Sequence, residues 1–95
     1  MENQYVVKVL NNIADILEMQ GVEFKPQAYR RAAQEIEVLQ ESIEDICVRN
    51  ELEDISGVGK HIAAKIKELV ETGKLKYYKK LKKSTKIDIE ALNEI

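Results

Sequence analysis

The sequence predicts an all-α fold, a small bundle of several helices. Apolar residues recur three or four positions apart along most of the 95 residues, which is the period of a helix face. Proline occurs once, β-branched runs are few, and residues typical of helix ends separate the apolar stretches. A chain of this length can bury one core, so we expect one main domain.

The first two predicted helices have clear boundaries. The first starts near Asn3, a favoured N-cap residue, and stops before Gly21, which suits a left-handed position. The second opens at Pro26, because a missing N–H costs nothing in the first turn. Their apolar stripes comprise Val6, Leu10, Ile13 and Leu17, and then Tyr29, Ala32, Ala33 and Ile36.

A third, short helix is predicted after Ser42, which forms a capping-box pattern with Asp45. Its apolar residues are Ile43, Ile46 and Cys47. Cys47 is the one cysteine, so it can form no internal disulfide and is expected to be a small buried hydrophobe of an intracellular protein. Leu52 and Ile55 fit a further turn or two of helix.

Two more helices complete the prediction. One carries an apolar stripe and is closed by Gly73; the stripe comprises Ile62, Ile66, Leu69 and Val70. The last is predicted from Leu75 to Lys83, with Leu75, Tyr78 and Leu81 as its apolar set. The terminal IDIEALNEI, 87–95, resembles the beginning of another element.

Charge is distributed unevenly along the chain. The net charge is −2, but residues 1–59 carry five basic and twelve acidic side chains, and residues 60–86 carry ten basic and two acidic ones. Such a basic segment attracts polyanions through its local field, whatever the net charge. A solvated lysine-rich surface is the alternative explanation.

The segment ISGVGKHIAAKI, 55–66, has the features of a helix-hairpin-helix. Gly57 and Gly59 flank Val58, and glycine permits both φ > 0 and close approach of a ligand to the backbone. A helix begins near Lys60, and the first N–H groups of a helix favour an anion. We therefore expect main-chain donors here to hold a DNA backbone phosphate. A hairpin that only joins two helices is the alternative.

Other glycine motifs do not fit this segment. A dinucleotide-binding motif needs a third glycine at Ile62 and a preceding strand. A P-loop needs glycine at Asp54 and Ser or Thr at His61. His61 lacks a Cys or His partner at metal-binding spacing.

Three blocks carry a family resemblance: AYRRAA in 28–33, the hairpin itself, and ETGKL in 71–75. Together they resemble the N-terminal helix-hairpin-helix domain of family X DNA polymerases, of the DNA polymerase beta type in bacteria and archaea. The resemblance implies a role in base excision repair, with binding of gapped, nicked or single-stranded DNA and its 5′-phosphate. It also implies that residues 1–86 are this domain, that 87–95 lead into a second hairpin, and that the Mg²⁺-dependent nucleotidyltransferase palm is absent.

The resemblance implies site residues as well. Lys65 matches the family's Schiff-base lysine for deoxyribose-phosphate lyase activity, and Lys25 and Tyr29 match phosphate contacts. Main-chain carbonyls of Glu53, Ile55 and Val58 match a Na⁺ or K⁺ site; no other cofactor is implied. The chain departs from the family pattern at His61 and Tyr77, which replace phosphate-binding lysines, at Phe24, which replaces a histidine, and at Ala64, which replaces an acidic residue.

The residues themselves leave the role of Lys65 open. His61, Lys65 and Glu68 share one helix face. A lysine attacks an aldehyde as the neutral amine, and His61 or Glu68 is a candidate for the accompanying proton transfer. The alternative is a solvated Lys65 paired with Glu68.

Further phosphate contacts are expected from basic residues near the hairpin. We expect Arg30 to lie on the DNA side and Arg31 to be solvated. The full phosphate-binding set is Lys25, Tyr29, Arg30, Gly57, Val58, Gly59, Lys60, His61, Lys74 and Lys76.

Three functions fit these features: a DNA-binding lyase, a non-catalytic DNA-backbone module, and a protein-interaction helical domain. The sequence shows no signal peptide pattern and no apolar run of membrane-spanning length. We therefore expect a monomeric cytoplasmic protein, nucleoid-associated in a prokaryote.

Overall fold

The computed structural model describes the backbone of residues 1–93 and the side chains of residues 1–84. Every regular element in that part of the chain is helical, which confirms the all-α prediction. The elements are α1 (Asn3–Met19), α2 (Lys25–Glu37), α3 (Ile43–Val48), the 3₁₀ helix η1 (Leu52–Asp54), α4 (Lys60–Thr72) and α5 (Lys76–Asn93). No described helix has the length and apolarity needed to span a membrane.

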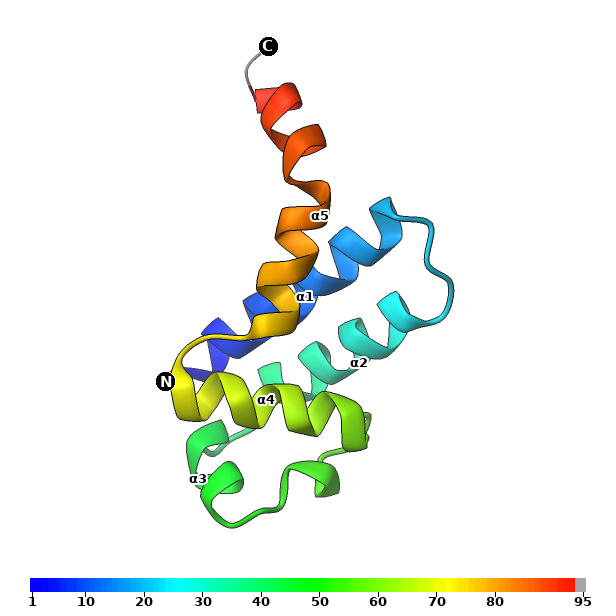
Figure 1. Ribbon diagram of the computed structural model, residues 1–95. Coiled ribbons are helices and arrows are strands. Elements are labelled where there is room, and N and C mark those ends of the chain that lie inside the picture. Colours follow the sequence, from blue (N-terminus) through cyan, green and yellow to red (C-terminus); the bar gives the residue numbers. More distant parts are fainter. Residues whose placement is uncertain (94–95) are drawn as a thin grey trace.

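The most extensive helix packing is between α1 and α2. Figure 1 shows α1 and α2 as an antiparallel pair, with α4 running across α2 and with α3 on the other side of α4. The start of α5 crosses α1, and its later turns project away from the other helices (Figure 1). Asn12 of α1 donates a hydrogen bond to the Tyr78 hydroxyl at 2.9 Å, which helps to hold α5 on α1.

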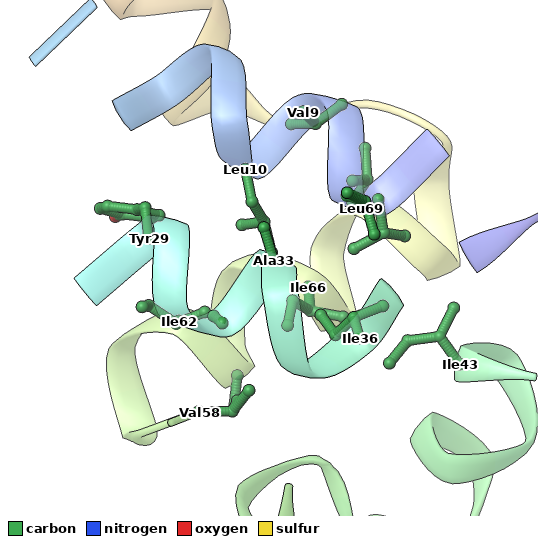
Figure 2. Close-up of a cluster of buried hydrophobic side chains, with 14 of the residues drawn as sticks. Val9, Leu10, Tyr29, Ala33, Ile36, Ile43, Val58, Ile62, Ile66 and Leu69 are labelled. Atoms are coloured by element: carbon green, nitrogen blue, oxygen red, sulfur yellow. The ribbon is translucent and has the colours of Figure 1, made fainter. Parts of the chain in front are cut away.

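The predicted apolar stripes form the core. All four residues of the α1 stripe and all four of the α2 stripe are buried, as are Ile62, Ile66 and Leu69 of α4. Figure 2 shows Leu10 of α1, Ala33 and Ile36 of α2, and Ile66 and Leu69 of α4 meeting between these three helices. The buried face of α1 is wider than its predicted stripe, because α1 is covered by both α2 and α5. The additional buried residues are Val7, Val9, Ala14 and Ile16.

Three helices end at a residue in the left-handed conformation. Gly21 has φ +76°, and the Val22 N–H donates to the Leu17 carbonyl at 3.0 Å in a Schellman motif. Gly73 closes α4 at the same φ. α3 ends in a second Schellman motif with Asn50 in the left-handed position, at φ +59°, a role that asparagine tolerates.

The start of α1 corrects one prediction. Asn3 is the first residue of α1 and does not cap it. Its side-chain oxygen instead accepts the Ile43 N–H at 2.8 Å, and its amide donates to the Glu41 carbonyl at 2.9 Å. Asn3 therefore caps α3, together with the predicted cap Ser42, whose hydroxyl accepts the Glu44 N–H.

The end of α5 corrects a second prediction. The predicted helix stops at Lys83, whereas α5 continues to Asn93 because no glycine or proline interrupts the chain there. The proposed domain boundary between residues 86 and 87 falls inside this helix. Of the predicted lead-in 87–95, the side chains and the last two residues lie outside the described part.

Cys47 is a free, buried thiol, as predicted. Burial raises its pKa, the nearby Glu71 carboxylate adds to that effect, and the Lys67 ammonium opposes it. It therefore packs as a small hydrophobe against α4.

Candidate functional site

The hairpin begins with a tight turn. The Val58 N–H donates to the Ile55 carbonyl at 3.0 Å, and Gly57 at the third position has φ +80°. This is the pattern of a type II turn, which requires a residue that accepts φ > 0. Val58 is 4% exposed and points into the core in Figure 2. Because its N–H is used within the turn, Val58 contributes packing and not a free donor.

Gly59 plays a different part from Gly57. It is the N-cap of α4 with φ −90°, a value that any residue adopts, so the predicted need for φ > 0 applies to Gly57 alone. A Cβ at Gly59 would meet no protein atom within 4 Å. The glycine therefore leaves open space in front of the first turn of α4.

The N-terminus of α4 has no side-chain cap and no acidic residue in its first turn. The N–H groups of Lys60, His61 and Ile62 precede the first intrahelical bond, which the Ala63 N–H makes to the Gly59 carbonyl at 2.8 Å. The N-terminus of α3, by contrast, is capped by two side chains. The positive end of the α4 dipole thus remains uncompensated.

A cavity of about 470 Å³ opens at this helix end. Its walls come from the hairpin, the first turns of α2, α4 and the start of α5, and none of the described residues that line it is acidic. It brings together most of the predicted phosphate-binding set. The lining residues are Lys25, Ala28, Tyr29, Gly57, Gly59, Lys60, His61, Ile62, Lys65 and Tyr77.

Two tyrosines form the aromatic wall of the cavity. The rings of Tyr29 and Tyr77 stack with centroids 6.3 Å apart and planes 15° from parallel. Burial, and then the neighbouring Tyr77, raises the pKa of Tyr29 well above its usual value. Its hydroxyl therefore stays protonated at neutral pH and is able to donate a hydrogen bond to an anion.

Lys65 completes the wall beside Tyr77. Its ammonium lies over the Tyr77 ring, 4.7 Å from the centroid, in a cation–π contact. Within the described residues Lys65 makes no ion pair, so the alternative of a Lys65–Glu68 pair is wrong. The aromatic contact holds the ammonium at the cavity without neutralising it.

Glu68 does not line this cavity. Its carboxylate accepts the Lys76 N–H at 2.8 Å and thereby caps the start of α5. Of the two proton-transfer candidates, only His61 lies at the cavity, because Glu68 is engaged at the far end of α4.

Three predicted phosphate contacts also lie elsewhere. Arg30 pairs with Asp15 at 2.8 Å and with Glu18, which ties α2 to α1. Lys74 and Lys76 are exposed beyond the C-terminal end of α4, the 13-residue helix that begins at the hairpin. Arg31 is exposed, as predicted, and its side chain lies against Gly57 of the hairpin.

Tyr77, Ala28 and Arg31 were not among the predicted site residues. The sequence singles out Tyr77 only as a departure from the family pattern. Tyr29 is buried and Tyr77 is partly buried, and the two rings meet at the basic start of α4 because of the position of α5. Phe24, the other aromatic departure, is 82% exposed and has φ +70°, with the Lys25 N–H donating to the Glu23 carbonyl across it. It forms a γ-turn that starts α2 beside the cavity.

A model of a known family matches this chain. It is described as a helix-hairpin-helix domain, and it matches residues 1–75, from the first residue of the chain to the start of α5. A search of curated proteins found no match.

Proposed function

Because the chain belongs to the helix-hairpin-helix domain family, whose members generally bind DNA, we propose that its cavity binds the backbone and 5′-phosphate of gapped or nicked DNA. One observation carries the proposal. The uncapped N-terminus of α4 faces a cavity whose lining has three lysines, a histidine and no described acidic residue. In a chain of net charge −2, this concentration of positive charge favours a phosphate ligand.

Different groups of the cavity have different roles in binding a phosphate. The N–H groups of Lys60, His61 and Ile62 supply fixed donors, and Lys25 and Lys65 supply charge. Tyr29 supplies a hydroxyl donor. These groups contact phosphate and sugar, so they position the strand without reading its sequence.

Gapped DNA with a 5′-phosphate is the sharpest probe. We expect it to bind about tenfold more tightly than the same DNA ending in a 5′-hydroxyl, because several charge-assisted hydrogen bonds depend on that phosphate. Lys25→Ala removes most of this preference in a fluorescence anisotropy titration. Lys8→Ala removes the same charge from an exposed position of α1, away from the cavity, and leaves the preference intact.

The preference is expected to shrink as salt is raised, because binding releases counterions from the DNA. Equal affinity for the two ends at low salt, or an equal loss in both lysine variants, contradicts the proposal.

Lyase chemistry at Lys65 is a second candidate for the same cavity. It is favoured by the position of Lys65, which is half-buried, lines the same cavity as Lys25 and has no carboxylate partner among the described residues. The amine would add to the C1′ aldehyde of an abasic sugar and lose water to form an imine. Proton removal from C2′, for which His61 is the candidate, then breaks the C3′–O3′ bond.

Borohydride trapping on DNA with a 5′-deoxyribose phosphate separates the two functions. A covalent adduct that forms with the native chain and is lost in Lys65→Ala supports the lyase. Normal DNA binding without an adduct would show that the domain binds DNA and has no lyase activity. This is the result expected if the Lys65 ammonium over Tyr77 serves only as a phosphate contact.

We also propose, on the resemblance of its sequence blocks, that the domain serves a family X repair polymerase. A monovalent cation at the hairpin is part of that proposal. Its carbonyls belong to Glu53 in η1 and to Ile55 and Val58 in the turn, and Ile55 keeps one lone pair after accepting the Val58 N–H.

A further inference from the structure

Arg31 lies against the outer side of the hairpin. A Cβ built on Gly57 would come within 2.9 Å of the Arg31 Cγ and 3.0 Å of its Nε, so the arginine side chain covers this glycine. Its Nη2 is 3.4 Å from the Ser56 hydroxyl. Arg31 does not line the cavity, although Gly57 does, so its guanidinium stands just outside the cavity beside the turn.

The charge of Arg31 is available for a ligand. Arg30 pairs with Asp15 and Glu18, and Arg49 pairs with Glu41 and Glu51. Among the described side chains, Arg31 is the one arginine without a carboxylate partner, even though Glu35 follows it by one turn of α2. An exposed guanidinium that packs its methylenes on the backbone and donates one N–H to the Ser56 hydroxyl keeps its other N–H groups for an oxyanion.

We propose that Arg31 and Ser56 form a second phosphate subsite, which binds an internucleotide phosphate next to the end held in the cavity. The inference rests on the proposed DNA binding and extends it to a neighbouring linkage of the same strand. The planar guanidinium suits bidentate contact with two oxygens of a phosphodiester, and the Ser56 hydroxyl adds a donor. Gly57 lies between the two subsites because it lines the cavity and supports Arg31.

The test compares Arg31→Met with Arg30→Met. Both remove one positive charge and keep an aliphatic side chain, so the methylene packing on Gly57 survives in the first. We expect Arg31→Met to weaken binding of 5′-phosphorylated gapped DNA about five- to tenfold and to lower the salt slope by about one, since one phosphate contact is lost. Arg30→Met is expected to stay within about twofold, because Arg30 is already paired with α1 carboxylates.

Neutral methylphosphonate linkages then locate the subsite. Replacing internal phosphates one at a time should identify a linkage whose neutralisation weakens the native chain but not Arg31→Met. If Arg31→Met binds normally, or if it weakens binding yet responds to every methylphosphonate as the native chain does, the subsite is refuted. Failure of the proposed function differs from both results, since the native chain would then show no preference for the 5′-phosphate.

Discussion

Gly57→Ala is expected to lower the affinity for 5′-phosphorylated gapped DNA by about tenfold or more and to destabilise the fold. An alanine at φ +80° costs about 1–2 kcal/mol of backbone strain. Its Cβ would also meet the Arg31 side chain at 2.9 Å, so either Arg31 or the turn must move. Movement of the turn shifts the N–H groups at the start of α4, which costs hydrogen bonds to phosphate worth roughly 1.5–3 kcal/mol.

Gly73→Ala is the matched control for this change. Gly73 has φ +76°, close to that of Gly57, but a Cβ there would meet nothing within 4 Å. Both variants therefore have backbone strain, which thermal or urea unfolding measures. Only Gly57→Ala also has the steric clash with the Arg31 side chain, and only this variant is expected to lose DNA affinity. Equal effects of the two substitutions on binding would show that the hairpin geometry does not matter.

Ile66→Ala is expected to give the largest loss of stability, about 2–5 kcal/mol in urea unfolding. Ile66 is fully buried and lies between α4 and α2 beside Ile36 and Ala33 (Figure 2). Because native domains are stable by only about 5–15 kcal/mol, this loss is a large part of the total. The substitution also weakens the packing of α4 against α2, and the first turn of α4 forms the proposed binding site.

The control for the core substitution is Val48→Ala. Val48 is 85% exposed at the end of α3, so its truncation is expected to change stability by no more than about 0.5 kcal/mol. A loss from Ile66→Ala as small as that of the control would contradict the packing described here.

The fold was predictable from sequence where the signal is local. Helical spacing placed the apolar faces, and Gly21, Ser42 and Gly73 marked helix boundaries because their physical preferences act within one turn. The end of the last helix was predicted at Lys83, although no glycine or proline follows Lys83 to stop a helix. The hairpin part of the candidate site was predictable because its glycines and Lys60, His61 and Lys65 are close in sequence.

The errors concern side chains whose partners are distant in sequence. Asn3 caps α3, forty residues away, and no local pattern indicates that. Arg30 and Arg31 are adjacent and both lie outside the apolar stripe, so only the packing of α1 and of the hairpin on α2 decides which of them is paired. Tyr77 reaches the cavity because the chain reverses direction between α4 and α5, and this reversal depends on the Glu68 cap and on Gly73.

The central claim is that free N–H groups at the start of α4 hold a phosphate. Amide chemical shifts followed during titration with 5′-phosphorylated gapped DNA test it most directly. The claim predicts large, saturating shifts for Gly59 to Ile62, much smaller ones with the 5′-hydroxyl DNA, and no change in α3, whose N-terminus is capped. If the DNA binds while the amides of residues 59–62 keep their free positions, the phosphate is held elsewhere and the account is wrong.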